Sequence, residues 1–434
     1  MKNKKQLFFM LLLAVAVFLR FFRLGSAALS PAEIDNCAIS LEPGFLQVFF
    51  GAMDRGAHPP LFNVIQGFFM ALAGTGNFSA RFLPALFGAL GFLVFFRTAR
   101  SLFSEKVAYL AAVLYAINPL FIQASRQAGP ESMFLLLSML VLYYFFMSLK
   151  YNSFIAGPYT IWSIAALYTH SSAVFLILAL NFIVLVTHRK DLRPGPWLLS
   201  QAVVFSAWLP YAVASIKPAE PQLTAVSVLL APLYQVKSFF FGMHIAPSLI
   251  IIAAVVVCVF FTVLGAASRH KAAEKRLLDA MAITAGLGIF FQFVIALKVP
   301  QESSAVNLGY AAALTLLILS VGASYMSDIG LFAFSALVIS VTAYALVSYY
   351  RDSSIRPVDY RSIYVKAVDL GEEGDLVVHT SPVSYRAFSY YNDYAIKAGF
   401  SNKLRQEPKE EELPAKGAVA AKMRKNMREW LRKS

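Results

Sequence analysis

Two carboxylates, Glu33 and Asp35, lie close together shortly after the first long apolar run of the chain. A carboxylate at a membrane–water boundary can act as a general base or as a metal ligand. A structural interpretation is also open, because Ser30-Pro31 followed by Glu33 is typical of the first turn of a helix. The spacing of these residues therefore leaves both interpretations of Glu33 standing.

Three other short segments place ionisable side chains beside apolar runs. His58 precedes a Pro-Pro pair, Arg126 and Glu131 share one loop, and His170 lies in a tight junction. Arg126 could bind a phosphate and Glu131 could bind a metal. The alternatives are an interfacial anchor pair for Arg126 and Glu131, and ordinary loop or turn residues for the two histidines.

The composition indicates what must position these side chains. The 434 residues are 58% hydrophobic and 14% charged, whereas soluble domains average about 45–50% apolar and about 25% charged residues. The apolar residues form long uncharged runs, and in a bilayer such runs must be helices or closed barrels. Because the runs lack the alternation of barrel strands, we predict an all-α polytopic membrane protein.

About 11 transmembrane helices are expected, since each span needs about 20 apolar residues. We place them at residues 7–22, 82–98, 107–123, 132–149, 154–168, 171–187, 197–215, 247–264, 277–297, 308–325 and 329–349.

The cations give this threading a direction. The net charge of +14 would suggest nucleic acid for a soluble protein, but lysines and arginines collect in alternate short loops, as membrane topology requires. We therefore expect no nucleic-acid partner. The pattern predicts a multi-pass plasma (inner) membrane protein with a cytoplasmic N-terminus and its C-terminal tail outside.

The apolar segment 59–74 could be mistaken for a span. If it crossed the bilayer, the cations at Arg97, Arg100 and Lys106 would face outward and the charge bias would break. We predict a juxtamembrane helix at the outer surface, within an outer loop that covers residues 24–81. A second, moderately long outer loop is expected at residues 216–246.

The chain is expected to have three parts. Residues 1–350 form the transmembrane domain, residues 351–400 form a small extramembrane α/β module, and residues 401–434 form a charged tail. Within the module, residues 360–370 read as a helix, 375–380 as a strand and 384–391 as a second helix or turn. The two cysteines, Cys37 and Cys258, predict no disulfide framework.

Six sequence elements occur in an order that is specific when taken together. They are Arg20 and Arg23 followed by Ala32-Glu33; His58-Pro59-Pro60-Leu61; residues 81–88 (RFLPALFG); residues 119–122 with Ser125-Arg126 and Glu131; Thr169-His170; and Leu209-Pro210. Over these residues the chain resembles the dolichyl-phosphate-mannose-protein mannosyltransferase superfamily and its bacterial relatives, including the aminoarabinose transferases of lipid A. These are membrane glycosyltransferases with the GT-C fold.

The resemblance implies a function and a set of site residues. The implied reaction moves a sugar from a polyprenyl-phosphate donor to an acceptor hydroxyl on the outer face, with inversion and with help from a carboxylate. Glu33 is expected to be the base, with Asp35 as its substitute. The donor phosphate is expected to meet His58 and Arg126, with support from Arg81, Glu131 and His170. An Arg-Tyr pair common in the family near the later outer spans is not evident here, so Lys298 and Lys237 are expected to bind the phosphate in its place.

Partners and cofactors follow from the same resemblance. The expected partners are the lipid-linked sugar, a protein, lipid or glycan acceptor, and membrane lipids. A divalent metal held by Glu33 and Glu131 is the one cofactor considered.

The chain departs from the family where the first residue of the acidic pair, usually Asp, is Ala32. A catalytically impaired relative that binds lipid-linked sugar, or that partners an active enzyme, is therefore the alternative function. A lipid flippase or transporter fits less well, because the mid-span positions are apolar.

Overall fold

The computed structural model describes most of the chain in two compact units, Met1–Pro357 and Val358–Ser434. The described residues are 2–55, 58–186, 194–214, 225–243, 248–267, 272–296, 305–351, 358–371, 376–377, 379, 382–397 and 405–406.

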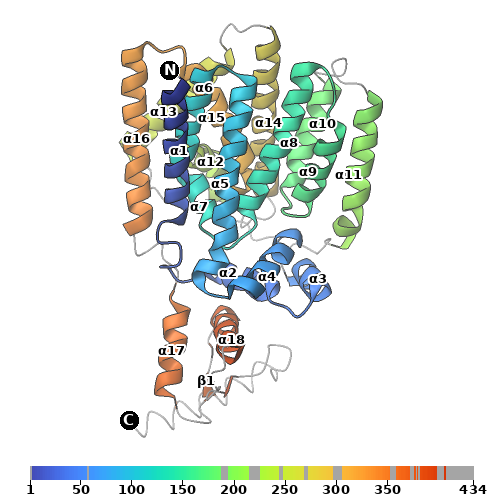
Figure 1. Ribbon diagram of the computed structural model, residues 1–434, viewed down its shortest axis with the longest axis vertical. Coiled ribbons are helices and arrows are strands. Elements are labelled where there is room, and N and C mark those ends of the chain that lie inside the picture. Colours follow the sequence, from blue (N-terminus) through green and yellow to red (C-terminus); the bar gives the residue numbers. More distant parts are fainter. Residues whose placement is uncertain are drawn as a thin grey trace. The chain divides into compact units, whose positions relative to one another are not determined.

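The first unit is a bundle of roughly parallel and antiparallel helices (Figure 1). The elements of the bundle are α1 (Lys2–Phe21), α5 (Asn77–Leu102), α6 (Glu105–Ile117), α7 (Pro119–Ser125), α8 (Glu131–Tyr151), α9 (Ala156–Leu167), α10 (Ala173–Val186), α11 (Pro194–Ala214), α12 (Ala225–Phe241), α13 (Leu249–Ala267), α14 (Ala272–Ala296), the 3₁₀ helix η2 (Ala305–Leu308), α15 (Gly309–Ala323) and α16 (Asp328–Arg351).

In the described part of the chain, seven helical segments are long and apolar enough to cross a membrane. An eighth is the pair α6 and α7, bent by 54°. The bend falls at Asn118-Pro119, where the Asn118 side chain accepts a hydrogen bond from Leu120 N (2.9 Å) and starts a new helix. The predicted all-α polytopic class is confirmed, and each predicted span coincides with a helix or with this pair. The count of eleven stays a prediction.

Three short helices lie across one end of the bundle (Figure 1). They are α2 (Pro31–Ser40), α3 (Phe45–Arg55) and α4 (Leu61–Ala73). Helix α4 occupies the segment for which we predicted a juxtamembrane helix. Gly67 of α4 lies so close to the Ser40 carbonyl that a Cβ there would overlap it, so the α2–α4 crossing requires glycine.

The N-terminal end of α1, which carries Lys5, lies at the opposite end of the bundle from α2, α3 and α4 (Figure 1). Lys5 of α1 pairs with Glu105 of α6, and Arg100 of α5 lies 3.7 Å from the same carboxylate. Lys106 donates to the Ser324 carbonyl (3.0 Å). For these described cations, the predicted separation from the polar site elements is present in the fold. Which end faces the cytoplasm stays a prediction.

One segment that we predicted as loop is partly helical. Helix α12 lies within residues 216–246 and packs against α7, α14 and α15. The physical reason is its apolar C-terminal turn, in which Phe239, Phe240 and Phe241 are buried. Pro232 and Lys237 interrupt the apolar run, so its hydropathy alone did not indicate a buried helix.

The second unit contains α17 (Tyr360–Leu370), β1 (Leu376–Val377), α18 (Pro382–Lys397) and β2 (Arg405–Gln406). The two short strands pair in parallel, with Leu376 opposite Arg405. Helix α17 is capped by Asp359, whose side chain accepts a hydrogen bond from Ser362 N (3.1 Å). Tyr364 packs edge-on against Phe388 and joins the two helices.

Candidate active site

Glu33 lies at the centre of a buried polar network at the α2 end of the bundle. Helix α2 begins with a capping box, in which Glu33 N donates to Ser30 Oγ (3.3 Å) and Ser30 N donates to Glu33 Oε2 (2.7 Å). The helix-start interpretation of Ser30-Pro31 and Glu33 is thus confirmed. The capping box fixes the direction in which the carboxylate points.

Arg81 binds this carboxylate with two parallel hydrogen bonds. Its Nε donates to Glu33 Oε1 (2.7 Å) and its Nη2 donates to Glu33 Oε2 (2.9 Å). The same guanidinium donates to the carbonyls of Leu24, Ala27 and Ala28. The side chains of Glu33 and Arg81 are each only 6% exposed, so the pair is shielded from water. It ties α2 and the preceding loop to α5.

A fourth donor completes the shell around Glu33. Ala128 N donates to Glu33 Oε1 (2.9 Å), and the Ala128 carbonyl accepts from Asn36 Nδ2 (3.2 Å). Burial opposes the charged form of Glu33, yet the hydrogen bonds and charge of Arg81, with the two backbone donors, hold its pKa below the ordinary value. A low pKa and four bound donors suit a structural carboxylate better than a general base.

Glu131 presents a different carboxylate beside the first. It begins α8, three residues after Ala128, and its Oε2 is buried without a hydrogen-bond partner in the described structure. The carboxyl group curls over Gly129, where a Cβ would overlap Oε2. Asp35, the other predicted carboxylate, is half-buried on α2. Because Glu131 Oε2 accepts no hydrogen bond in the described structure, it is available to a substrate hydroxyl.

Arg126 caps the end of α1. Its Nη1 donates to the carbonyls of Arg20 (3.0 Å) and Phe22 (2.7 Å), and its guanidinium lies 4.9 Å from the ring centre of Tyr350. Its Nε is buried without a partner among the described residues. Arg126 therefore places a positive charge in the loop that also carries Glu131, and one of its donors remains available.

The two predicted histidines stack on each other. The ring centres of His58 and His170 lie 4.3 Å apart, and Phe134 stacks on the other side of His170 at 4.8 Å. Leu61 N donates to the Tyr168 carbonyl (2.9 Å), which holds the Pro-Pro turn against the α9–α10 junction. Sequence elements more than one hundred residues apart thus meet.

Both imidazoles are neutral at pH 7. Burial lowers the pKa of His58 to about 4. Burial, and then the neighbouring His58, lower the pKa of His170 well below its ordinary value. The His170 Nδ1 accepts from Ser172 N (3.1 Å), which places any proton of the neutral ring on Nε2. These rings can hydrogen-bond a phosphate or a hydroxyl, but they bring no positive charge.

Of the two remaining predicted phosphate ligands, one falls among the described residues. Lys237 is half-buried on α12, where burial lowers its pKa and its Nζ donates to the Met243 carbonyl (3.3 Å). Lys298 is outside the described residues.

The predicted metal site finds little support in the geometry. Within the described ranges, no three His, Cys, Asp or Glu side chains cluster as a metal would need. Four donors already occupy the Glu33 carboxylate, so it has little capacity left for a cation. A metal at Glu33 and Glu131 stays a prediction, and we assign it no step.

Three contributors to this site were not predicted. The Ala128 peptide group and Asn36 join α2 to the loop before α8, and Asn63 of α4 donates to the Asn36 carbonyl (3.1 Å). A backbone group leaves no signal in a sequence. The amides at 36 and 63 were visible, but their pairing depends on how α2 crosses α4.

Arg20 was identified only as part of a motif. It is fully buried, donates to the Ala16 carbonyl (2.9 Å), and lies 5.7 Å from the Tyr115 ring centre. Its Nε and Nη2 have no hydrogen-bond partner in the described structure. An arginine this deep in the bundle has a cost that only its neighbours can offset.

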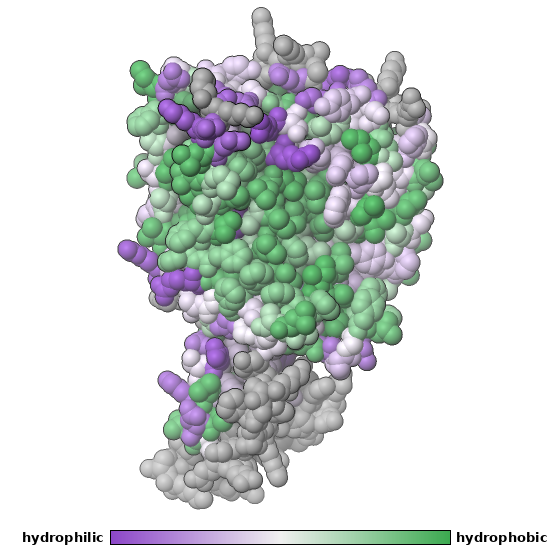
Figure 2. Space-filling view, viewed as in Figure 1, coloured by the Kyte–Doolittle hydropathy of each residue, from purple (hydrophilic) through white to green (hydrophobic). Residues whose placement is uncertain are grey.

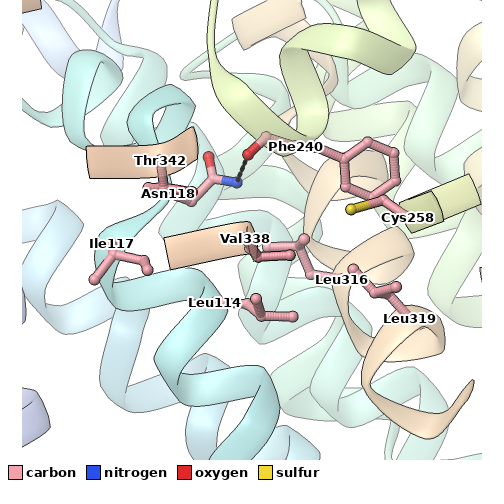
Figure 3. A pocket seen from close by; sticks show the side chains of 9 residues that line it. All are labelled: Leu114, Ile117, Asn118, Phe240, Cys258, Leu316, Leu319, Val338 and Thr342. Atoms are coloured by element: carbon pink, nitrogen blue, oxygen red, sulfur yellow. Dashed lines mark hydrogen bonds between the residues drawn. The ribbon is translucent and has the colours of Figure 1, made fainter. Parts of the chain in front are cut away.

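A cavity among the described helices of the bundle is too small to be a substrate pocket. It is lined by Leu114, Ile117, Asn118, Phe240, Cys258, Leu316, Leu319, Val338 and Thr342 (Figure 3). Its polar side is occupied, because Asn118 Nδ2 donates to the Phe240 carbonyl (3.3 Å). With about 10 Å³ of free space, the cavity holds about one water molecule and no sugar.

Comparisons with known proteins agree with this architecture. The profile of the dolichyl-phosphate-mannose-protein mannosyltransferase family matches residues 57–213. Among solved structures, ArnT from Cupriavidus metallidurans bound to undecaprenyl phosphate is 14% identical, with a TM-score of 0.60 over 92% of this chain and 86% of that chain.

A second similar structure is the Archaeoglobus fulgidus oligosaccharyltransferase in complex with Zn and sulfate. It is 16% identical, with a TM-score of 0.50, over 88% of this chain and 61% of that chain. No curated protein sequence matches the chain significantly. At these identities the likeness to solved structures concerns the fold.

Proposed function

We propose a reaction for this chain on the premise that it has the GT-C fold and belongs with the membrane glycosyltransferases of the dolichyl-phosphate-mannose-protein mannosyltransferase superfamily. The proposed reaction transfers a sugar from a polyprenyl-phosphate donor to an acceptor hydroxyl on the outer face of the membrane. The single observation that carries it is the Glu131 carboxylate, whose Oε2 is buried and unpartnered beside the Arg126 loop.

In the proposed step, the acceptor oxygen attacks the anomeric carbon as the carbon–oxygen bond to the phosphate breaks. The acceptor proton passes to the Glu131 carboxylate, and the bonding electrons leave with the polyprenyl phosphate. A single displacement of this kind inverts the anomeric carbon. A positioned base contributes about 100- to 10,000-fold to the rate of such a step.

The phosphate is proposed to meet Arg126 and the histidine pair. The free Nε of Arg126 supports the first contact, and positive charge there stabilises the leaving group. His58 and His170 contribute as neutral hydrogen-bonding groups, in keeping with their lowered pKa values.

Glu33 takes a positioning role in this proposal. Its sequence-based assignment as the base stays a prediction, but its oxygens already accept from Arg81, Ser30 and Ala128. Through Ala128 it fixes the loop that presents Glu131, so loss of Glu33 acts on the reaction through geometry.

The test is mass spectrometry of glycolipids and glycoproteins from membranes with and without the chain. We expect a product that depends on the wild-type chain and falls at least 100-fold with Glu131→Gln. Glu105→Gln is the matched control, because the Glu105 side chain is 46% exposed and lies outside the site, and it is expected to retain more than half of the product. Unchanged product with Glu131→Gln, at wild-type protein level, would overturn the assignment of the base.

The second candidate function is a catalytically impaired relative that binds lipid-linked sugar. Ala32 favours it, because this exposed position in the first turn of α2 carries no carboxylate. Binding of polyprenyl phosphate by the purified chain, without any product that depends on the chain in cells, distinguishes this function from the first.

A further inference from the structure

The last turn of α16 carries two adjacent tyrosines, Tyr349 and Tyr350, beside the end of α1. Tyr350 Oη donates to the Leu19 carbonyl (2.7 Å), and the Tyr350 ring packs edge-on against Phe22, with ring centres 6.1 Å apart. The two tyrosine rings contact each other, with their centres 5.3 Å apart. Both side chains are half-buried, so the last turn of α16 is joined to the end of α1.

Arg126 lies directly over this pair of tyrosines. Its Cζ is 4.9 Å from the centre of the Tyr350 ring, which is inside the range of about 6 Å over which the face of an aromatic ring attracts a guanidinium. Tyr349 lies within hydrogen-bonding reach of the same guanidinium. Both tyrosines therefore hold Arg126, and they leave its Nε without a partner in the described structure.

The carbonyls at the end of α1 hold only the terminal nitrogens of this guanidinium. Arg126 Nη1 donates to the Phe22 carbonyl (2.7 Å), and Nη2 donates to the Arg23 carbonyl over a long 3.5 Å. A guanidinium is planar and carries its donors in a fixed fork. The contact with the Tyr350 ring limits rotation of that plane, and it thereby fixes the direction in which the Nε–H bond points.

Most of α16 faces away from the bundle. Only 33% of its most apolar stretch is buried in the chain, compared with 89% for the segment Ala305–Ala323, and hydrophobic surface covers the side of the bundle that Figure 2 shows. Tyrosines at the end of such a helix are ordinarily interfacial anchors with their hydroxyls among the lipid headgroups. Tyr349 and Tyr350 instead direct their polar groups to the chain itself.

We propose that Tyr349 and Tyr350 are positioning residues of the phosphate site, which orient Arg126 so that its Nε can bind the leaving phosphate. This inference rests on the proposed function, because it takes Arg126 as a ligand of the donor phosphate. Tyr350 acts through the face of its ring and Tyr349 through its hydroxyl. Both lie outside residues 57–213, which the family profile matches. The last helix of the bundle thus contributes to a site whose other residues come from the first half of the chain.

The experiment measures binding of farnesyl phosphate to the full chain in lipid nanodiscs by titration calorimetry, with farnesol as the ligand that lacks the phosphate. Arg126→Ala gives the full loss of the phosphate contact. Tyr350→Leu removes the ring, Tyr350→Phe keeps the ring but loses the bond to the Leu19 carbonyl, and Tyr349→Phe removes one hydroxyl. Tyr344→Leu is the matched control, because Tyr344 lies on the same helix and is 62% exposed.

We expect Arg126→Ala to weaken the binding of farnesyl phosphate at least about tenfold. Tyr350→Leu should weaken it about fivefold, and Tyr350→Phe should restore it to within about twofold of the wild type. Tyr349→Phe should weaken it about threefold. Tyr344→Leu should have no effect, and farnesol should bind equally to every variant. The rescue by Tyr350→Phe separates positioning from a structural role, because this variant has lost the hydrogen bond to α1.

The outcomes separate this inference from its premise. Unchanged binding with Arg126→Ala would remove the phosphate contact from the proposed function, and the positioning role with it. Weakened binding with Arg126→Ala but not with Tyr350→Leu would overturn the positioning role alone. Tyr350→Phe as weak as Tyr350→Leu, or Tyr344→Leu equally weak, would also overturn it, in favour of a structural tie or an interfacial anchor. Tyr349→Phe, which removes a single oxygen, keeps the test decisive if Tyr350→Leu fails to fold.

Discussion

The two ends of the bundle use charge in opposite ways. At the basic end, Lys5 and Glu105 are each nearly half exposed, and Arg100 is 60% exposed. At the site end, Arg81 and Glu33 are each 6% exposed and share two hydrogen bonds. Exposed pairs contribute little to stability, whereas breaking a buried pair leaves an uncompensated charge. The predicted role of the basic end is to orient the chain in the membrane, whereas the buried pair at the site end holds α2 against α5.

The largest effect is expected from breaking the buried pair. Arg81→Met leaves the Glu33 carboxylate buried with only its backbone donors. We expect a loss of about 3–5 kcal/mol in the free energy of unfolding, measured on the detergent-solubilised protein.

The double variant Glu33→Gln/Arg81→Met separates charge from packing. It removes both charges, so it should be more stable than Arg81→Met alone. A double variant less stable than Arg81→Met would contradict the account of the site end.

Acidification should act on the same pair. The pKa of Glu33 is lowered in the folded chain. Its stabilising contribution is therefore complete above the unfolded pKa of about 4.3 and is lost as pH falls through the folded value. Glu33→Gln should lose this acid-dependent part, seen as a flatter unfolding curve below pH 5.

The membrane class and the positions of the polar elements could be predicted from the sequence, because apolar runs and loop cations are local features of the chain. It also indicated the cap at Ser30-Pro31. It could not decide the role of Glu33, since that depends on Arg81 and Ala128 arriving from distant segments. Whether a carboxylate can act as a general base or only as a positioning group depends on how many hydrogen-bond donors already contact it. The spacing of residues along the sequence does not reveal that number.

The next effect in size is expected at the histidine pair. The unfolded chain binds a proton on His58 below about pH 6.5, whereas the folded chain does so only near pH 4. Stability is thus complete above pH 6.5 and falls as pH drops. Between pH 7 and 5 the loss is about 2 kcal/mol. His58→Gln should reduce this slope, and an unchanged slope would show that the imidazole is not buried.

A smaller effect is expected from Arg126, which caps α1 and stacks on Tyr350. Arg126→Ala should cost about 1–2 kcal/mol, because it leaves the last carbonyls of α1 without a donor. Arg126→Lys is the control, expected to keep the charge but only part of the bonding. If Arg126 also binds the donor phosphate, Arg126→Lys should lower the amount of product even where it leaves the free energy of unfolding almost unchanged.

The smallest effect is expected at the basic end. It tests whether the exposed ion pairs there contribute less to stability than the buried pair at the site end. Glu105→Gln removes the partner of both Lys5 and Arg100, yet all three side chains remain in contact with water. The unfolding midpoint should not change measurably, and raising the salt concentration should remove any difference that exists. A destabilisation as large as that of Arg81→Met would mean that the two ends are built alike. An unchanged midpoint would agree with the predicted role of these cations in orienting the chain in the membrane.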